Sequence, residues 1–286
     1  MQQGQPSRTA LGAARARAFH QTEDAPHIFA DPLAVTIAGA ATAAVASTER
    51  PDDDGIPAEA RLFLAMRHRF AEDALAKAAG GIRQVVVLGA GLDTFAYRNP
   101  YPDLTVFEVD HPATQAWKRD RLADAGIAVP AELRFVPVDF ETGTLAEGLA
   151  AVGFSRTEPA FFLWLGVVQY LTPDAVEATL RYIVEHGAAA QVVFDYSEPP
   201  SALPAPHQPM VEALAQVMER LGEPWLSLFT VDDITAKLQT IGFDEIEDLD
   251  WRQMIARYAP DSPAADLVGG HVLRAAHTGH VEVLAP

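Results

Sequence analysis

The chain has 286 residues, of which 49% are hydrophobic and 21% are charged, as expected of a folded globular protein. Its 39 acidic and 21 basic residues give a formal net charge of −18, which repels nucleic-acid phosphates and anionic lipid headgroups and argues against both as partners. The absence of cysteine excludes disulfides, thiolate catalysis and cysteine zinc sites, and it fits a cytoplasmic protein. No amino-terminal stretch has the apolar core of a secretion signal.

Helical and strand-like patterns alternate from about residue 58 onward, which predicts an α/β fold with a mostly parallel sheet covered by helices on both faces. The predicted helices are Ala58–Ala79, His111–Ala125, Thr144–Ala151, Pro173–Glu185, Met210–Leu221 and Asp232–Thr240. The predicted strands are Gln84–Leu88, Thr105–Val109, Leu133–Val138, Ala160–Leu165 and Gln191–Asp195, followed by Phe243–Leu249 and His271–Ala275. Seven strands in this order predict a Rossmann-like sheet.

We predict one domain, 1–286. Two of its segments, 1–57 and 198–230, do not follow the alternation of helices and strands. Residues 1–57 form a helical lid before the cofactor-binding core of 58–197. Residues 198–230 form a cap that begins with a proline-rich connection, and 231–286 supply the helix and strands that complete the sheet. We expect the lid and the cap to lie over the carboxyl edge of the sheet, where ligands bind in such folds.

A glycine turn follows the first predicted strand and indicates a nucleotide site. The run Gly89-Ala90-Gly91 lets the backbone take positive φ and approach a ligand closely. The dinucleotide fingerprint requires a third glycine at position 94, which here is Thr94, preceded by Asp93. A carboxylate at that place would repel a pyrophosphate but suits the ammonium of an amino-acid tail. The turn therefore favours S-adenosyl-L-methionine over NAD or FAD.

Acids at the ends of the next two strands extend this prediction. Glu108 and Asp110 lie about 20 residues after the turn, where an acid can bind both ribose hydroxyls, and Asp110 is favoured because it is nearer the strand end. Asp139 and Phe140 end the third strand and suit an adenine amino group and ring, although Asp139 is equally well placed to cap a helix. His111 joins the predicted cofactor contacts, with the start of a helix as its alternative role.

Several motifs together resemble those of the leucine carboxyl methyltransferase superfamily, in particular its bacterial O-methyltransferases, some of which act on polyketides. The matching segments are Arg67–Asp73, Gln84–Thr94, Ala96–Arg98, Phe107–Pro112 and Trp164–Thr172, and the similarity extends from about Ser7 to the carboxyl terminus. Phe95 replaces the arginine usual in the bacterial branch, and Leu165 replaces an acid of the eukaryotic enzymes. These departures make a protein-phosphatase tail an improbable substrate.

The resemblance implies a class I methyltransferase fold and roles for three further residues. It implies that Arg67 binds the cofactor carboxylate and can reach the acceptor, whereas a lone helical arginine is usually solvated. It implies that Tyr170 contacts the substrate; the alternative is a buried ring whose hydroxyl bonds to backbone. Leu165, at the end of the fourth strand, is included among the cofactor contacts. Arg17 is a second candidate anion contact.

A hydroxyl acceptor would need a general base, whereas a carboxylate acceptor would not. His207, in the cap where substrate would enter, is the preferred candidate over His20, His111, His271 and Tyr196. The sequence has no H-E-x-x-H motif, so we predict no metal, and no G-x-S-x-G motif, which argues against a hydrolase.

The predicted function is therefore adenosylmethionine-dependent O-methylation of a small acid or hydroxyl compound of secondary metabolism. Two alternatives remain at this point. One is an adenosylmethionine-binding enzyme with other chemistry, such as cyclisation or hydroxylation, and the other is a protein that binds the cofactor without catalysis. The expected partner is the small-molecule acceptor, with a homodimer left open.

Overall fold

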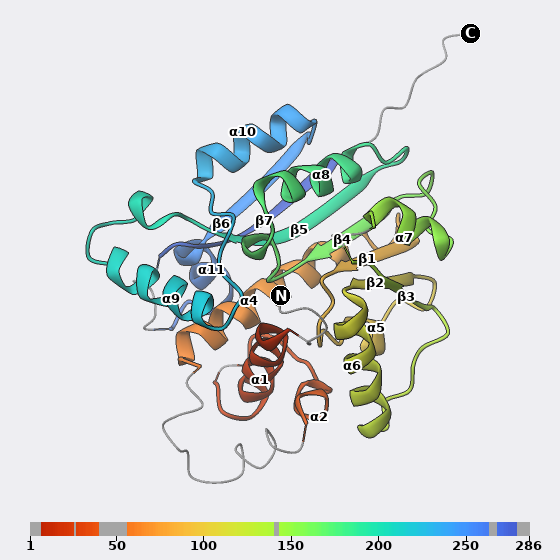
Figure 1. Cartoon of the computed structure of the whole chain (residues 1–286), viewed down its shortest axis with the longest axis horizontal. Helices are drawn as coiled ribbons and strands as arrows, with labels where there is room; N and C mark the ends of the chain where they lie inside the picture. The colour runs from red at the N-terminus through yellow and green to blue at the C-terminus, as the bar shows by residue number, and fades with distance from the viewer. Residues whose placement is uncertain (1–6, 26, 40–55, 140–142, 263–267, 279–286) are drawn as a thin grey trace.

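The computed structural model describes residues 7–25, 27–39, 56–139, 143–262 and 268–278. These residues form a seven-stranded sheet in the order β3-β2-β1-β4-β5-β7-β6 (Figure 1). The strands are β1 Gln84–Leu88, β2 Thr105–Asp110, β3 Leu133–Pro137, β4 Ala160–Trp164, β5 Ala190–Ser197, β6 Glu245–Asp250 and β7 Gly270–His277. All pairs from β3 to β5 are parallel, and β7 runs antiparallel to both of its neighbours. The predicted α/β fold and its mostly parallel sheet are confirmed.

The middle of the sheet is apolar on both faces because helices cover both. All five residues of β1 are buried, and so are all five of β4. The chain leaves β1 for β2 on one side and returns to β4 on the other, so Val85 lies between Val106 and Phe161. This reversal of strand order opens a crevice beyond the carboxyl ends of β1 and β4, where open α/β sheets bind ligands.

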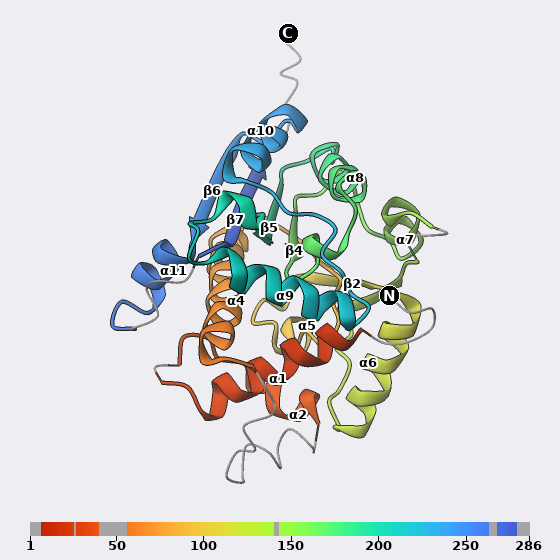
Figure 2. The same ribbon diagram turned by 60° about the vertical axis from the view of Figure 1, so that its left-hand side comes forward.

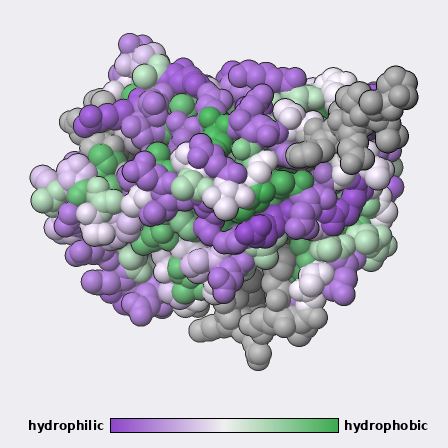
Figure 3. All heavy atoms as spheres, turned by 90° about the horizontal axis from the view of Figure 1, so that it is seen from above, coloured by the Kyte–Doolittle hydropathy of each residue, from purple (hydrophilic) through white to green (hydrophobic). Residues whose placement is uncertain are grey.

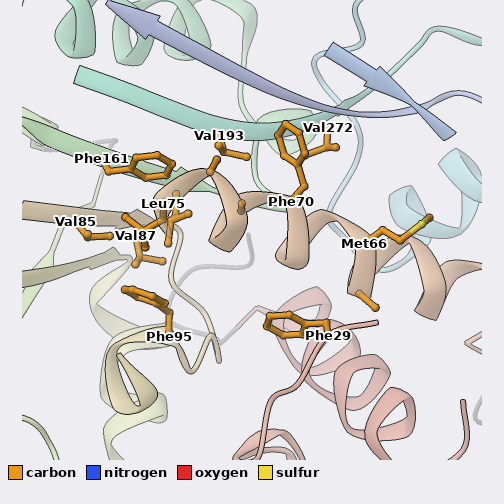
Figure 4. Close-up of a cluster of buried hydrophobic side chains, with 14 of the residues drawn as sticks. Phe29, Met66, Phe70, Leu75, Val85, Val87, Phe95, Phe161, Val193 and Val272 are labelled. Atoms are coloured by element: carbon orange, nitrogen blue, oxygen red, sulfur yellow. The ribbon is translucent and has the colours of Figure 1, made fainter. Parts of the chain in front are cut away.

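Helices α4 (Ala58–Ala78), α5 (Phe95–Arg98) and α11 (Trp251–Tyr258) pack on one face of the sheet. In Figure 4, Phe70 of α4 points toward Val193 of β5 and Val272 of β7. Helices α7 (Leu145–Ala151), α8 (Pro173–Val184) and α10 (Val231–Ile241) pack on the other face. Because successive strand residues point to opposite faces, neighbouring valines such as Val85 and Val86 belong to different clusters.

The predicted lid and cap meet beside the sheet. Helices α1 (Arg8–Thr22) and α2 (Ala34–Ala38) pack with α6 (Pro112–Asp124) in a third apolar cluster. The cap contains the short helix η2 (Pro200–Ala202) and α9 (Gln208–Arg220). Figure 2 shows α9 passing beside α1, and the Thr9 amide donates to Glu223 Oε2 at 3.3 Å.

Among the described residues, the α-helices α5 and α11 and the short helices η1 (Val168–Tyr170) and η2 were not predicted from the sequence. Helix α11 begins directly after β6, where the Asp250 side chain accepts from the Gln253 amide and Gln253 bonds back to the Asp250 amide. Helix α5 is a single turn after the glycine loop.

Hydrophilic residues cover much of the face shown in Figure 3, with apolar side chains gathered in groups between them. No helix within the described ranges is long and apolar enough to cross a membrane.

Candidate functional site

A cavity of about 1020 Å³ lies beyond the carboxyl ends of β1, β2 and β4. It is walled by residues from the glycine turn, from α1 and α4, from the segment after β4, and from α9 and the chain that follows it. One drug-sized ligand usually occupies a pocket of roughly 300–1,000 Å³. The cavity is therefore large enough for a nucleoside cofactor and a second small molecule side by side.

The glycine turn forms the floor of the cavity and leaves no room for side chains. Gly89 and Gly91 have φ of +62° and +45°, which β-carbons disfavour. A β-carbon at Gly89 would lie 2.4 Å from Val167 Cγ2, and one at Gly91 would lie 3.1 Å from the Ala10 β-carbon. Gly89, Ala90 and Gly91 all line the cavity, as predicted for a backbone cradle.

Asp110 connects the glycine turn to the end of β2. Its Oδ2 accepts the Gly91 amide at 2.5 Å, and its Oδ1 accepts the His111 amide at 2.7 Å. Burial raises the pKa of Asp110, while these two amides oppose that rise. His111 also lines the cavity and caps α6, with Nδ1 accepting the Ala113 amide at 3.2 Å, so its alternative role as a helix start is confirmed.

Glu108 does not line the cavity, which corrects its inclusion among the ribose contacts. It is 1% exposed, lies 2.8 Å from Lys118 Nζ, and accepts a hydrogen bond from the Tyr97 hydroxyl at 3.2 Å. Burial raises the pKa of Glu108, partly offset by the charge of Lys118. Glu108 lies two residues before the end of β2, beneath helix α6. Its ion pair with Lys118 of that helix stabilises the packing of α6 on the strand.

Asp93 faces the cavity as a carboxylate with fixed partners. Its Oδ1 accepts the Phe95 amide at 2.7 Å, and its Oδ2 lies 3.5 Å from His68 Nε2. His68 Nδ1 in turn donates to the Leu64 carbonyl at 2.7 Å, which fixes the ring. Burial alone would raise the pKa of Asp93, but the hydrogen bond from His68 and the charge of Arg17 hold it well below its usual range. The side chain is therefore ionised at neutral pH.

Arg67 enters the cavity from α4 and is braced by Asp195 at the end of β5. Arg67 Nη1 donates to Asp195 Oδ2 at 2.7 Å, while Asp195 Oδ1 accepts the Gly166 amide at 2.5 Å. Arg67 is 6% exposed, and its Nε is buried without a hydrogen-bond partner among the described residues. Sequence reasoning missed Asp195. Its signal is an acid within the otherwise apolar run Val192–Tyr196 of a strand buried on both faces.

Tyr170 ends the short helix η1 (Val168–Tyr170) and lines the cavity from the side of β4. Burial raises the pKa of Tyr170, although Trp225 and Gln169 nearby oppose that rise. The Gln169 carbonyl accepts the Leu226 amide at 2.7 Å, which fastens the chain after α9 to η1. Tyr170 therefore stays protonated at neutral pH and presents a hydroxyl donor.

A profile of the leucine carboxyl methyltransferase family matches residues 10–184, more than half of the chain. This chain belongs to that family. YktD of Bacillus subtilis, described as a candidate S-adenosyl-L-methionine-dependent methyltransferase, is 37% identical over 180 residues, 59% of either chain. SCO7813 of Streptomyces coelicolor, described in the same way, is 38% identical over 188 residues, which are 63% of this chain and 65% of that protein. The matches thus span about three-fifths of these relatives.

A solved structure shows the same fold over nearly the whole chain. A candidate methyltransferase from Thermobifida fusca is 18% identical, covers 98% of this chain and 97% of its own, and has a TM-score of 0.59. The structure places the two positions at which the sequence was expected to depart from the family pattern. Phe95 is buried in the core beside Val87, and Leu165 lines the cavity.

The other predicted site residues divide between the cavity and places outside it. Asp139 lines the cavity, and the side chain that caps α7 is Thr144, so the capping alternative for Asp139 is wrong. Phe140 lies outside the described residues. His207 occupies the amino end of α9 and is not in the cavity lining, which corrects its assignment as a base.

The remaining base candidates are engaged elsewhere. His20 lies 3.1 Å from Asp24, and His271 lies 3.1 Å from Asp248, which also accepts the Tyr196 hydroxyl at 2.5 Å. Arg17 does line the cavity, with Nε donating to Asp31 at 3.2 Å and Nη2 to the Leu92 carbonyl at 2.6 Å. No cluster of three or more His, Cys, Asp or Glu suited to a metal ion occurs in the described part of the chain.

Proposed function

We propose that this chain transfers a methyl group from S-adenosyl-L-methionine to a carboxylate or hydroxyl oxygen of a small-molecule acceptor. One observation carries the proposal: the glycine turn, the Asp110 carboxylate and the buried Arg67 guanidinium all border one cavity. The family match and the descriptions of YktD and SCO7813 support the same activity. We further propose that the enzyme acts in the cytoplasm on a compound of secondary metabolism, without nucleic-acid or membrane partners, in keeping with the net charge of −18.

The residues present fit this cofactor at both of its ends. At the nucleoside end, Asp110, which holds the Gly91 amide, would accept ribose hydroxyls, and Asp139, in the cavity lining, would accept an adenine amino group. At the amino-acid end, ionised Asp93 suits an ammonium. The buried Nε of Arg67, which has no hydrogen-bond partner among the residues that the structure describes, suits an acceptor such as a carboxylate. An isolated buried donor is costly, so a ligand that satisfies Nε is favoured.

The bound cofactor would supply a methyl group on a positively charged sulfur, open to in-line attack. A carboxylate acceptor carries no proton to be removed, and a hydroxyl acceptor binds as the anion after its proton has passed to solvent. The chain's own residues align that anionic oxygen and exclude water from it. Tyr170 keeps its proton and donates a hydrogen bond that orients the acceptor oxygen. Helix α1 and the segment after α9 meet over the cavity through the Thr9 amide and Glu223, which limits access of solvent.

Calorimetric titration with S-adenosyl-L-methionine and S-adenosylhomocysteine tests the cofactor assignment. Asp110→Ala should abolish or strongly weaken both titrations, while Asp103→Ala, on the exposed loop before β2, should bind like the wild type. If neither compound binds the wild type, the proposal is wrong. Mass spectrometry of products from extracts of small acids and phenols tests the chemistry, because only methyl transfer adds a methyl group and releases S-adenosylhomocysteine.

A further inference from the structure

Helix α9 carries a row of exposed apolar side chains on one face. Met210, Leu214, Val217 and Leu221 are 50%, 45%, 38% and 37% exposed, and their spacing of three and four residues places them in line along the helix. We call these four residues the α9 strip. Exposed apolar residues scattered singly are ordinary on a protein surface, but a contiguous row beside a pocket marks a binding groove.

The α9 strip is continuous with the wall of the cavity. Leu221, the last residue of the strip, also lines the cavity, as do Met218 on the neighbouring face and Leu226 beyond the helix. Leu226 is itself 49% exposed, so the apolar lining reaches solvent at this side of the cavity. A molecule whose reactive end lies near Tyr170 therefore has an apolar path outward along α9.

We infer that the acceptor of this enzyme carries an extended apolar chain, which leaves the cavity past Leu221 and lies along the α9 strip. The inference rests on the proposed function and adds the class of acceptor, an amphiphile with its oxygen at one end. The cavity lining supports it, because Leu171, Ala175 and Leu226 belong to that lining and are apolar. Burial of a chain against the strip removes apolar surface from water on both partners.

A second copy of the chain is the other occupant to consider for this surface. A stable dimer buries roughly 800 Å² on each partner, which four partly exposed side chains of one helix do not provide. The net charge of −18 also opposes the approach of two copies. A small amphiphile meets neither obstacle.

The test uses the full-length protein and para-alkylphenols and para-alkylbenzoates of increasing chain length, from ethyl to octyl. Affinity is measured by calorimetry with and without saturating S-adenosylhomocysteine. For the wild type, each added methylene should tighten binding by about two- to fourfold, the range expected for partial to full burial. Leu214→Gln and Val217→Gln should flatten this dependence for the longer chains and leave the ethyl compounds unchanged.

Val129→Gln is the matched control, because Val129 is 51% exposed and lies in the connection between α6 and β3, outside the cavity lining. It should keep the wild-type dependence on chain length. Equal affinity of ethyl and octyl compounds for the wild type would overturn the inference. A wild-type dimer in sedimentation that Leu214→Gln dissociates would overturn it too, because a second copy would then occupy the strip. Failure of S-adenosylhomocysteine to bind, with the chain-length dependence intact, counts against the proposed function alone.

Discussion

Asp195 holds Arg67 in place although the two residues are 128 positions apart in the sequence. One of its carboxylate oxygens accepts a hydrogen bond from the guanidinium, and the other accepts one from the Gly166 amide. The pair joins helix α4 and the end of β4, which both wall the cavity, to the end of β5 behind them. Because the guanidinium cannot lose its charge and is almost fully buried, its direction depends on this one carboxylate. Asp195 is therefore a positioning residue for Arg67.

The Asp195→Asn variant tests this brace. The amide keeps the shape of the side chain but cannot accept from both Arg67 and Gly166, so we expect binding of S-adenosylhomocysteine to weaken by about ten- to a hundredfold. Asp73→Asn removes a more exposed carboxylate paired with Arg69 on the same face of helix α4 and serves as the control. Calorimetry measures the dissociation constant of S-adenosylhomocysteine for each variant. Equal dissociation constants for Asp195→Asn and the wild type would show that Asp195 does not position Arg67.

Gly89→Ala should damage the cofactor cradle through steric overlap. The new β-carbon would lie 2.4 Å from Val167 Cγ2 in addition to the strain of a positive φ, for a combined cost of about 2–4 kcal/mol in the free energy of unfolding. Gly126→Ala is the matched control, because Gly126 has φ of +66° with nothing within 4 Å of the added carbon. It should cost only about 1–2 kcal/mol. Denaturant unfolding measures both variants, and equal losses would mean that Val167 moves aside freely.

Tyr170→Phe separates acceptor orientation from cofactor binding. Loss of the hydroxyl should lower kcat by about ten- to a hundredfold, because the acceptor oxygen loses the hydrogen bond that aligns it for in-line attack. Binding of S-adenosylhomocysteine should stay within about twofold of the wild type, because Tyr170, which lines the cavity, is proposed to contact the acceptor and not the cofactor. Since burial raises the pKa of Tyr170, wild-type activity should persist to a higher pH than the ionisation of an ordinary tyrosine, near pH 10, would allow. A large rise in the dissociation constant would instead place the hydroxyl on the cofactor.

Asp24, which follows helix α1, should make the free energy of unfolding depend on pH in the acidic range. Burial on its own would raise the pKa of Asp24, but hydrogen bonds from His20 and Arg61 and the charge of Arg61 lower it to about 2. A lowered pKa gives stability that is present above about pH 4 and is lost as the pH falls toward 2. After allowance for partial exposure, we expect Asp24→Asn to cost about 1 kcal/mol at pH 6.

Denaturant unfolding of the wild type and Asp24→Asn across pH 2–6 measures this effect. The difference between the two proteins should shrink as the pH falls through the window, because the wild-type carboxyl becomes protonated. A difference that is constant over the whole range would show that the loss arises from packing. Asp73→Asn, at the more exposed pair with Arg69, should change the free energy of unfolding by no more than about 0.5 kcal/mol.

The strands and the glycine turn were predictable because their signals are local. A strand buried on both faces must be apolar throughout, as Val85–Leu88 is, and a turn with two positive φ values requires glycines at 89 and 91. Helix α11 was missed although its apolar residues Trp251, Met254 and Ile255 have helical spacing, because they follow β6 without a break.

The roles of individual acids were less predictable because they depend on distant partners. Glu108 and Asp110 look alike in sequence, but Lys118 on α6 pairs with the first and leaves the second to face the cavity. Asp195 gains its role only because the fold brings Arg67 and Gly166 to it. His207 shows the reverse case, in which a residue in the right segment lies at a helix end outside the cavity.

The position of β7 between β5 and β6 has a consequence for synthesis on the ribosome. Residues pair from Ala190 with His277 to Ser197 with Gly270, so the strand that carries Asp195 gains its second neighbour only after residue 277 has been made, some 80 residues later. Until then eight residues of β5 present unpaired backbone groups, which invite association with other nascent chains. The strands around the glycine turn are therefore made before β7, which completes the edge of the sheet that positions Arg67.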